Sequence, residues 1–488
     1  MPIRRIHPPR VTAAVIDFPA IRARLGIPGV YPAAADAEAV AVAADPPQPA
    51  LDRTDLPLVT IDPIGSMDLD QAMHLEKTPA GFVVHYAIAD VASFVGETGA
   101  LHDETWRRGE TLYSPDLATP LHPRELSEGA ASLLPDLVRP AALWRIELDP
   151  TGEPGHVRVE RALVRSVARL DYLGVQADLD AGRLHPSIAA LPEIGRLRQA
   201  AARRRHAISL DLPDAEVVPD AVGHWTLSLR AQNEIEKANA EISLLTGICA
   251  ARMMMDAGIG LLRTLPPASA DQVALLRKSA AALGIPWPDG VPAGDVIAEL
   301  DSSRPTVAAF LDDAVHLLRG AGYTPFDGAV PAQPLHAGVG SIYAHVTAPL
   351  RRLADRYATE VCLALCAGHP VPPWVREALP KLSPVMAASG RRASDLERAC
   401  TGAVSVFLLT GREGATFQAT VLQVETVKNQ ATVLLHEPPV RARCAATGLT
   451  EGSIGPVRLV SVDQDTNTFV VAPVERTIPG GAVTLVAV

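Results

Sequence analysis

The segment that decides the fold of this chain is Thr60-Ile61-Asp62-Pro63-Ile64-Gly65-Ser66-Met67-Asp68-Leu69-Asp70-Gln71-Ala72. The apolar run that ends at Ile61 predicts a buried strand, and the proline and glycine after it predict a loop. Asp68 and Asp70 are two residues apart, so in an extended segment both carboxylates point to the same side, while Asp62 ends the preceding strand. Three acids this close repel unless protons or hard cations screen them, so the segment predicts a Mg²⁺ or Mn²⁺ site. The plainer interpretation of the spacing alone is a solvated acidic turn.

This segment resembles the catalytic signature of the RNase II/RNase R (RNB) family of exoribonucleases, in which Thr-Ile-Asp-Pro and a short loop precede Asp-Leu-Asp-Asp-Ala. Four further blocks resemble family blocks and follow in the family's order. They are His85-Tyr86-Ala87-Ile88-Ala89-Asp90-Val91, Thr111-Leu112-Tyr113-Ser114-Pro115-Asp116, Leu121-His122-Pro123-Arg124-Glu125-Leu126-Ser127 with Ser132-Leu133 after it, and Tyr343-Ala344-His345-Val346-Thr347-Ala348-Pro349-Leu350-Arg351-Arg352-Leu353-Ala354-Asp355.

Composition limits the class of protein. The chain has 488 residues, of which 48% are hydrophobic and 20% charged, so we expect two or three domains and a sizeable core. The net charge of −11 argues against binding of polyanions over the whole surface, although a basic channel can lie inside an acidic shell. Only 4% of the residues are aromatic, so any base-stacking platform is built from few side chains.

The five cysteines are sparse and lie mostly in apolar helical contexts, which predicts core packing rather than a zinc site. The basic first ten residues are not followed by the apolar segment of a secretory signal. The long apolar stretch around residues 242–262 contains charged residues and predicts a core helix rather than a membrane span. We therefore expect a cytoplasmic protein.

The pattern along the chain predicts an α+β protein in three parts. Residues 1–50 are rich in Ala and Pro and predict a short cap and an irregular linker, too short for the cold-shock domains that typical family members have there. Residues 51–410 predict the RNB catalytic domain, a mixed sheet flanked by helices, with strands up to about 170 and helices after 172. Residues 411–488 predict a five-stranded OB-fold barrel for RNA binding.

Individual elements follow from apolar periodicity. Strands are predicted at 82–88, 142–148 and 157–164 in the first half, and at 416–424, 431–435, 455–462 and 469–472 in the C-terminal domain. Helices are predicted at 235–249, at 353–365 after Pro349, and at 385–409 before Gly411.

The resemblance implies roles for the acids. Asp62, Asp68 and Asp70 are expected to hold magnesium and to position the attacking water, with Asp70 central to cleavage. Gln71 stands where the family normally has a fourth aspartate. Its amide oxygen can coordinate a hard cation but brings no negative charge, so we expect weaker metal binding. Two consequences are consistent with this expectation: a slower enzyme, and a protein that binds RNA but barely cuts it.

Two arginines are predicted to address phosphate. Arg351 and Arg352 are expected in the first turn of the helix that Pro349 opens, where guanidinium and free backbone N–H groups can bind one phosphate. By the resemblance, Arg351 faces the scissile phosphate. The plainer alternative is a surface arginine pair that caps Asp355.

Four further residues match RNA-contacting positions of the family: Tyr113, Tyr172, Glu241 and Glu397. Tyr113 would pack against the 3′-terminal nucleotide, although a buried core tyrosine is the plainer alternative. Glu241 could equally be a helix-surface acid. A second stacking aromatic, expected near residues 208–212, is absent from that stretch of sequence.

These patterns predict a Mg²⁺-dependent 3′-to-5′ exoribonuclease, with Mn²⁺ as an alternative cation, that hydrolyses single-stranded RNA to 5′-mononucleotides. We expect no membrane contact, and no obligate protein partner is evident. The first alternative is an RNB-like RNA-binding protein with weak or no catalysis, because Gln71 replaces the fourth aspartate. A more remote alternative is a metal hydrolase that acts on a small phosphoester.

Overall fold

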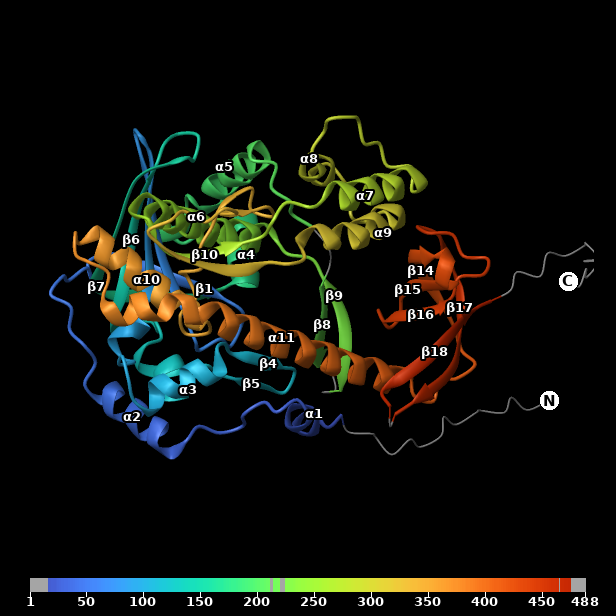
Figure 1. Cartoon of the computed structure of the whole chain (residues 1–488), viewed down its shortest axis with the longest axis horizontal. Coiled ribbons are helices and arrows are strands. Elements are labelled where there is room, and N and C mark those ends of the chain that lie inside the picture. The colour runs from blue at the N-terminus through green and yellow to red at the C-terminus, as the bar shows by residue number, and fades with distance from the viewer. Residues whose placement is uncertain (1–15, 211–213, 220–223, 465, 475–488) are drawn as a thin grey trace, which may run out of the picture.

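The computed structural model describes residues 16–210, 214–219, 224–464 and 466–474. Figure 1 shows an elongated molecule with a large body at one end and a small β-barrel at the other. The 37-residue helix α11 (Pro373–Leu409) runs from the body to the small barrel. The fold is α+β, as the sequence predicts.

The body contains a closed barrel with the strand order β1-β2-β3-β6-β7. Its strands are β1 (Leu58–Asp62), β2 (Gln71–Thr78), β3 (Gly81–Ala89), β6 (Val138–Leu148) and β7 (Pro154–Asp171). Neighbouring strands are antiparallel except β1 and β7, which are parallel. The three strands predicted in this half are confirmed, and β7 is longer than predicted because it continues along β1.

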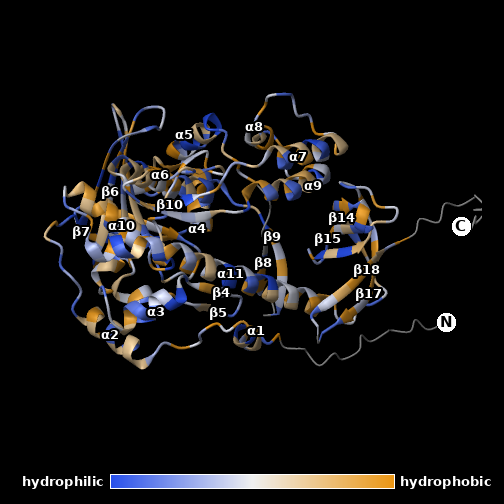
Figure 2. Cartoon of the chain, viewed as in Figure 1, coloured by the Kyte–Doolittle hydropathy of each residue, from blue (hydrophilic) through white to orange (hydrophobic). Residues whose placement is uncertain are grey.

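Helices cover both faces of these strands. They are α2 (Ala33–Ala44), α3 (Ala100–Arg108), α6 (Glu234–Ala257) and α10 (Leu353–Cys366). Val84 and Tyr86 of β3 pack in one cluster with α6 and α10, whereas Ala87 and Ala89 pack in another with α2 and α3. Because both faces are covered, every residue of β3 is buried. Figure 2 shows hydrophobic and hydrophilic residues mixed along the covering helices.

Helix α6 begins and ends with strong local signals. Asn233 and Glu236 form a reciprocal capping box at its start, and Gly258 ends it in the left-handed conformation, at a φ of 72°. The predicted helix over 235–249 is confirmed. The prediction of one core helix over the apolar stretch 242–262 is wrong at its end, because the chain leaves the helix at Gly258 and continues as β10 (Ile259–Thr264).

The region after residue 172 is less uniformly helical than predicted. Its other helices are α4 (Tyr172–Asp180), α5 (Leu191–Arg204), α7 (Ala270–Ala282), α8 (Ala293–Ala298) and α9 (Pro305–Ala314). Its strands form three two-stranded sheets: β8 (Asp214–Pro219) with β9 (Trp225–Arg230), β10 with β11 (Gly322–Asp327), and β12 (Leu335–His336) with β13 (Ser341–Ile342).

Helix α11 connects the body and the small barrel by packing against both. Its first half packs into the core of the body through Val375, Leu379 and Leu382. Its second half packs into the core of the small barrel through Leu396 and Val404. The predicted start near residue 385 is wrong, because the helix begins at Pro373 and continues through two internal prolines, at 380 and 384, that normally end a helix.

The C-terminal unit is a five-stranded antiparallel sheet in the order β16-β15-β14-β17-β18. Its strands are β14 (Thr416–Glu425), β15 (Gln430–Leu435), β16 (Arg441–Ala445), β17 (Ile454–Asp463) and β18 (Thr468–Pro473). The outer strands β16 and β18 also lie against each other, so the sheet curls into the barrel of an OB fold. The four predicted strands are confirmed, and only the short β16 was not predicted.

The described part of the N-terminal segment contains two helices where an irregular linker was expected. In α1 (Phe18–Arg24), Phe18 and Ile21 pack into the same core as the small barrel. In α2, Ala39 packs into the core of the body. Residues 16–50 therefore follow the length of the molecule and contact both units.

All five cysteines are free. Four of them are buried, which confirms core packing for these four, whereas Cys366 is partly exposed. Within the residues that the structure describes, no helix has the length and apolarity needed to cross a membrane.

Replacing Leu245 with alanine should destabilise the body. Leu245 is fully buried in α6, and emptying such a site costs about 2–5 kcal/mol. The matched control is Leu275→Ala on α7, because Leu275 is 68% exposed, and it should change the free energy of unfolding by less than about 0.5 kcal/mol. Thermal unfolding followed by circular dichroism measures both, and equal shifts would contradict the packing of α6.

Candidate active site

The predicted catalytic segment forms the connection between β1 and β2. Its three acids lie at the end of β1, within the loop, and directly before β2. Ser132 fixes the loop, because its Oγ accepts a hydrogen bond from the Leu69 N–H at 3.0 Å and donates to the Met67 carbonyl at 2.6 Å. Leu69 is fully buried between the acids on either side of it in the sequence. The loop is thus anchored by its own backbone and apolar side chain.

Asp70 is the most buried of the three acids. Its Oδ1 accepts a hydrogen bond from the Leu350 N–H at 2.8 Å, and its Oδ2 lies 3.8 Å from Arg351 Nε. Burial raises the pKa of Asp70 to about 8, even though the Arg351 guanidinium and the Leu350 amide both act to lower it. One arginine and one amide therefore do not offset the cost of burying this charge.

The pKa values of Asp62 and Asp68 are raised by burial as well. Burial, with the Asp68 charge added, raises the pKa of Asp62 to about 7, and burial also raises the pKa of Asp68. Asp62 Oδ2 is buried and has no hydrogen-bond partner. The cations that act on these two acids are Arg351 on both, Arg169 on Asp62 and Arg124 on Asp68. These three arginines therefore do not offset the cost of burying the acids.

The donor set fits a hard divalent cation. The three side chains offer only carboxylate oxygens, which Mg²⁺ and Mn²⁺ prefer, and a cation would provide the partner that Asp62 Oδ2 lacks. Among the described residues, no three His, Cys, Asp or Glu side chains are grouped closely enough to hold a metal ion alone. Oxygens of water or substrate would have to complete the coordination, and the predicted metal ligands stay predictions.

Gln71, the fourth predicted metal ligand, uses both ends of its carboxamide within the protein. Its Nε2 donates to the Thr347 carbonyl at 2.6 Å. Its Oε1 accepts a hydrogen bond from the Tyr86 hydroxyl and lies 3.4 Å from the Ser243 hydroxyl oxygen. A metal ion at Oε1 would compete with the Tyr86 hydroxyl.

Arg351 faces the acids from the segment before α10. The side chain is 42% exposed, and its charge acts on all three aspartates. The predicted location in the first helical turn is wrong, because α10 begins at Leu353. The backbone is held in a different pairing, in which the Arg351 carbonyl accepts the Thr111 N–H at 3.0 Å and the Leu353 N–H donates to Gly109 at 2.9 Å.

The Arg352 side chain forms an ion pair with Asp355. Its Nε lies 3.0 Å from Asp355 Oδ2 and its Nη2 lies 2.9 Å from Oδ1. Asp355 is fully buried, and the Arg352 side chain is 15% exposed. Arg352 therefore contacts Asp355, as the alternative of an arginine pair that caps Asp355 predicts. Its predicted RNA contact stays a prediction.

Tyr113 stands on the short hairpin of β4 (Leu112–Ser114) and β5 (Leu117–Thr119). It is 54% exposed, so the alternative of a buried core tyrosine is wrong. Burial of its hydroxyl and the Asp68 charge raise the pKa of Tyr113, whereas the Arg351 charge lowers it. An exposed ring thus stands within the electrostatic field of the acid cluster.

The Tyr113 hairpin is clamped by the N-terminal segment, a contact that sequence analysis did not predict. Arg22 of α1 donates to Ser114 Oγ at 2.6 Å and forms a two-pronged ion pair with Asp116. Ser114 Oγ in turn donates to the Leu117 carbonyl at 2.8 Å and closes the turn. No local sequence signal joins Arg22 to this hairpin, since 92 residues separate Arg22 from Ser114.

The other predicted RNA-contacting residues lie in different surroundings. Tyr172 begins α4, and its hydroxyl accepts a hydrogen bond from Asn239 at 3.0 Å; burial and then the Asp62 charge raise its pKa. Glu241 is buried on α6 at 9% exposure, so the alternative of a helix-surface acid is wrong. Burial raises the pKa of Glu241. Glu397 lies on the exposed side of α11.

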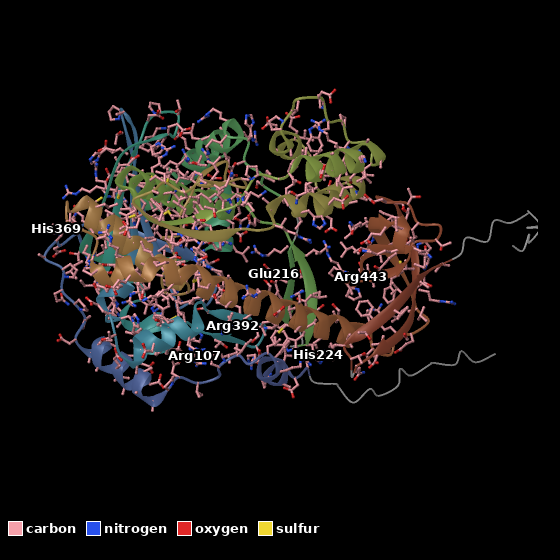
Figure 3. All side chains as sticks on the ribbon, viewed as in Figure 1. Arg107, Glu216, His224, His369, Arg392 and Arg443 are labelled. Carbon is pink, nitrogen blue, oxygen red and sulfur yellow. The ribbon has the colours of Figure 1, made fainter. Side chains whose placement is uncertain are left out.

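The second half of α11 is tied to the body by Arg392, which donates to the carbonyl groups of Arg107 and Arg108 at 3.1 and 2.6 Å. Figure 3 shows Arg392 and Arg107 close together where α11 passes α3. This contact fixes the helix that carries Glu397.

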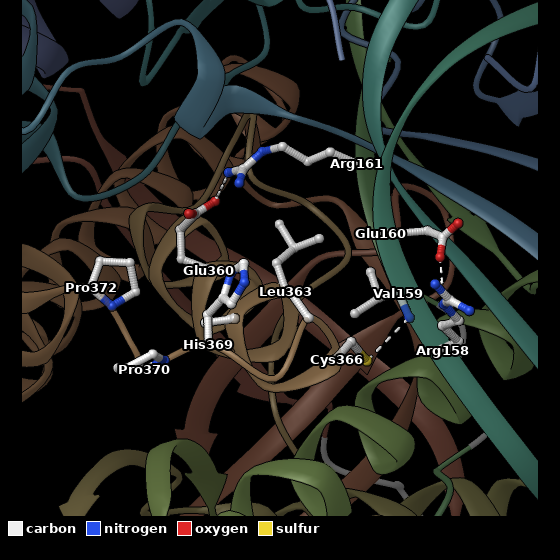
Figure 4. A pocket seen from close by; sticks show the side chains of 12 residues that line it. Arg158, Val159, Glu160, Arg161, Glu360, Leu363, Cys366, His369, Pro370 and Pro372 are labelled. Atoms are coloured by element: carbon white, nitrogen blue, oxygen red, sulfur yellow. Dashed lines mark hydrogen bonds and ion pairs between the residues drawn. The ribbon is translucent and has the colours of Figure 1, made fainter. Parts of the chain in front are cut away.

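A separate pocket of about 370 Å³ lies between β7 and the end of α10 (Figure 4). Arg161 pairs there with Glu360, and on its other side with the buried Asp90 at 2.8 Å. The pocket contains none of the predicted site residues. Because its charges are paired internally, we assign it no catalytic role.

The comparisons with known proteins agree with this architecture. Residues 51–366 match the RNB domain, and residues 415–474 match the RNase II-type exonuclease C-terminal S1 domain. The chain belongs to the RNB family.

Among curated proteins, ribonuclease R of Escherichia coli (strain K12) is 29% identical over 366 residues, which cover 70% of this chain and 44% of that protein. The exosome complex exonuclease RRP44 homolog A of Arabidopsis thaliana is 27% identical over 378 residues, covering 72% of this chain and 39% of the relative. The chain thus spans less than half the length of these two relatives.

Among solved structures, the apo form of Mycoplasma genitalium RNase R superposes with a TM-score of 0.82 at 20% identity, covering 94% of this chain and 78% of that one. Yeast Ssd1, described as a pseudonuclease, superposes with a TM-score of 0.67 at 19% identity, covering 82% of this chain and 51% of that one. Likeness at these identities shows the fold alone, and the fold occurs with and without nuclease activity.

Replacing each of the two neighbouring arginines should destabilise the protein to very different extents. Arg352→Ala leaves the buried Asp355 carboxylate without its cation and should cost about 3–5 kcal/mol. Arg351→Ala removes a partly exposed side chain at 3.8 Å from its partner and should cost less than about 1 kcal/mol. Differential scanning fluorimetry of the two variants tests this, and an unchanged melting temperature for Arg352→Ala would show that its ion pair contributes little.

Proposed function

We propose that this protein is a Mg²⁺-dependent 3′-to-5′ exoribonuclease that hydrolyses single-stranded RNA to 5′-mononucleotides. The observation that carries the proposal is that the Arg351 charge acts on all three of Asp62, Asp68 and Asp70 in an RNB domain. The positive charges near the acids do not compensate for their burial. A divalent cation would supply the missing charge, and the family resemblance implies that phosphodiester hydrolysis uses one at this site. The domain that residues 415–474 match is also described as belonging to RNase II-type exonucleases.

The roles of the side chains follow from their surroundings. Asp62, Asp68 and Asp70 would hold the cation. When bound, magnesium supplies an activated water and screens the phosphate charge. Arg351, with its free guanidinium edge, would bind the scissile phosphate and stabilise the negative charge that develops on it. Asp70 would also orient Arg351, since the two side chains are neighbours.

Single-stranded RNA as substrate rests on two features. Tyr113 offers an exposed ring beside the acids on which a terminal base can stack, and Tyr172 lies near Asp62. The S1-type barrel at the far end of α11 has the fold that single-stranded nucleic acids commonly occupy. Mycoplasma genitalium RNase R has been solved with ribose-methylated single-stranded RNA. The proposal also includes RNA contacts by Glu241, Arg352 and Glu397, which rest on the family resemblance.

The second candidate function is an RNA-binding protein with weak or no catalysis. Gln71 favours it, because the carboxamide brings no charge to the cluster and is engaged by Thr347 and Tyr86. A pseudonuclease with the same fold shows that this outcome has a precedent. The cytoplasmic location and the lack of an obligate protein partner stay predictions.

Replacing Asp70 with asparagine should abolish RNA shortening. The change removes one carboxylate from the acids that would hold the metal, and losing even a group that supports a metal ligand costs about 10–100-fold in activity, so at least this loss is expected. Purified wild type and Asp70→Asn would be incubated with 5′-labelled single-stranded RNA, with Mg²⁺, with Mn²⁺ and with EDTA, and the products resolved on a denaturing gel.

Progressive shortening from the 3′ end by wild type alone, lost with EDTA, is the expected result. Intact RNA in every lane together with a retained gel shift would replace the proposal with the RNA-binding alternative. Shortening by Asp70→Asn equal to that of wild type would remove the acids from the reaction.

Replacing Tyr113 with alanine should weaken the hold on the RNA end. A base stacked on an aromatic side chain contributes about 1–3 kcal/mol, so KM should rise about tenfold while the protein stays folded, because the ring is exposed. Tyr113→Phe is the matched control, since it keeps the stacking surface. A KM for Tyr113→Ala equal to that of wild type would exclude stacking on this ring.

A further inference from the structure

The orientation of the Gln71 carboxamide is fixed by its neighbours. The Thr347 carbonyl can only accept a hydrogen bond, so the atom that faces it at 2.6 Å must be the nitrogen of Gln71. On the other side, the Tyr86 hydroxyl donates to the Gln71 oxygen. A reversed carboxamide would bring two acceptors together at Thr347, so only one orientation satisfies both contacts.

The support behind Gln71 is rigid. Tyr86 is fully buried in β3, and its hydroxyl lies 2.8 Å from the hydroxyl of Ser243 on α6. Gln71, Tyr86 and Ser243 thus form one network that joins β2, β3 and α6. The network ends at Thr347, in the segment that leads to α10.

This segment, residues 347–351, carries Arg351 to the acid cluster. Four side chains hold it through its backbone: Gln71 at the Thr347 carbonyl, Asp355 at the Ala348 amide at 2.7 Å, Asp70 at the Leu350 amide at 2.8 Å, and His122 at the Leu350 carbonyl at 3.0 Å. The last of these contacts is next to Arg351 in the sequence. The position of the Arg351 guanidinium relative to Asp70 therefore depends on how this segment is held.

Asp70 and Gln71 hold the segment from opposite sides. Neighbouring residues of an extended chain point to opposite faces. Leu350, the partner of Asp70, packs in the cluster that contains α2 and α3, whereas Tyr86, the partner of Gln71, packs in the cluster that contains α6. Two contacts on opposite faces restrict the segment in two directions, which one contact cannot do.

We propose that Gln71 is a positioning residue, which locks the segment 347–351 through its Nε2 and so orients Arg351 toward Asp70, rather than a metal ligand. The inference deepens the proposed function and rests on it for the part that concerns Arg351. An ionised aspartate or glutamate here would present only oxygens, so neither could donate to the Thr347 carbonyl. The amide is therefore the group that this contact requires.

The test replaces Gln71 with glutamate, which keeps the length of the side chain and removes the donor. The matched control is Gln272→Glu on α7, where only the amide oxygen is used, to accept from the Ser269 N–H at 2.8 Å. Gln71→Met, which is similar in length and uncharged, is the second variant and separates the lost donor from the added charge. All variants are made in the full chain.

Three measurements decide the role. Hydrogen–deuterium exchange reports on the Ala348 and Leu350 amides, and a lost hydrogen bond of typical strength should speed their exchange about tenfold in both Gln71 variants. Mn²⁺ binding, followed by electron paramagnetic resonance, should change less than about threefold in Gln71→Met, which removes the carboxamide oxygen without adding a charge. In the RNA assay, kcat should fall about tenfold while KM changes little, because the loss concerns the orientation of Arg351.

Unchanged exchange in both Gln71 variants would overturn the proposal. So would Mn²⁺ binding that weakens tenfold or more in Gln71→Met, about 1.4 kcal/mol, because that outcome is expected when a metal ligand is lost. Gln272→Glu should leave all three readouts unchanged. If wild type cleaves no RNA, the proposed function fails, and the exchange measurement still decides whether Gln71 locks the segment.

Discussion

The hydrogen bond from the Leu350 amide to Asp70 joins two segments that are 280 residues apart, and the arrangement of the candidate active site depends on it. One segment belongs to the barrel, and the other leads into α10. They meet because α6 brings the second segment close: Gly247 has no side chain, and a Cβ there would lie 2.4 Å from the Ala344 carbonyl. The Ala344 amide uses this close approach to donate to the Gly247 carbonyl at 3.1 Å. The site is thus a property of the whole body rather than of one motif.

Burial of the acids makes this region intrinsically unfavourable, and the surrounding contacts compensate for it. The Arg352–Asp355 ion pair and the Ser132 contacts with the acidic loop are fully formed, whereas Asp62 Oδ2 has no partner. Active sites commonly hold such unsatisfied groups while the structure around them is well satisfied. The contrast between the adjacent arginines follows the same division, since Arg352 is used for stability and Arg351 faces the acids.

Much of the fold follows from local patterns, and most of what does not is long-range. Periodicity was sufficient for α6, α10 and the strands with clear apolar runs, and the ordered motifs were sufficient for the family. Periodicity was insufficient for β16, which is short. It was also insufficient for the start of α11, because the two prolines inside that helix are typical of a helix end. Within the site, the acids and Arg351 could be found from motifs. The partners of Gln71 could not, since Thr347 is 276 residues away and no pattern in one sequence connects them.

The clamp between Arg22 and the turn at Ser114–Asp116 has a consequence for the cost of recognition. An isolated two-stranded hairpin is marginally stable in water, and a ring displayed on one would sample many positions. Here Leu112 packs into the core that contains α1, and Arg22 ties down the turn, so Tyr113 is displayed on a support that is already ordered. A ligand that stacks on this ring would lose less conformational entropy on binding than one that must first order a loose hairpin. A short helical segment near the N-terminus can in this way contribute to affinity without touching the ligand.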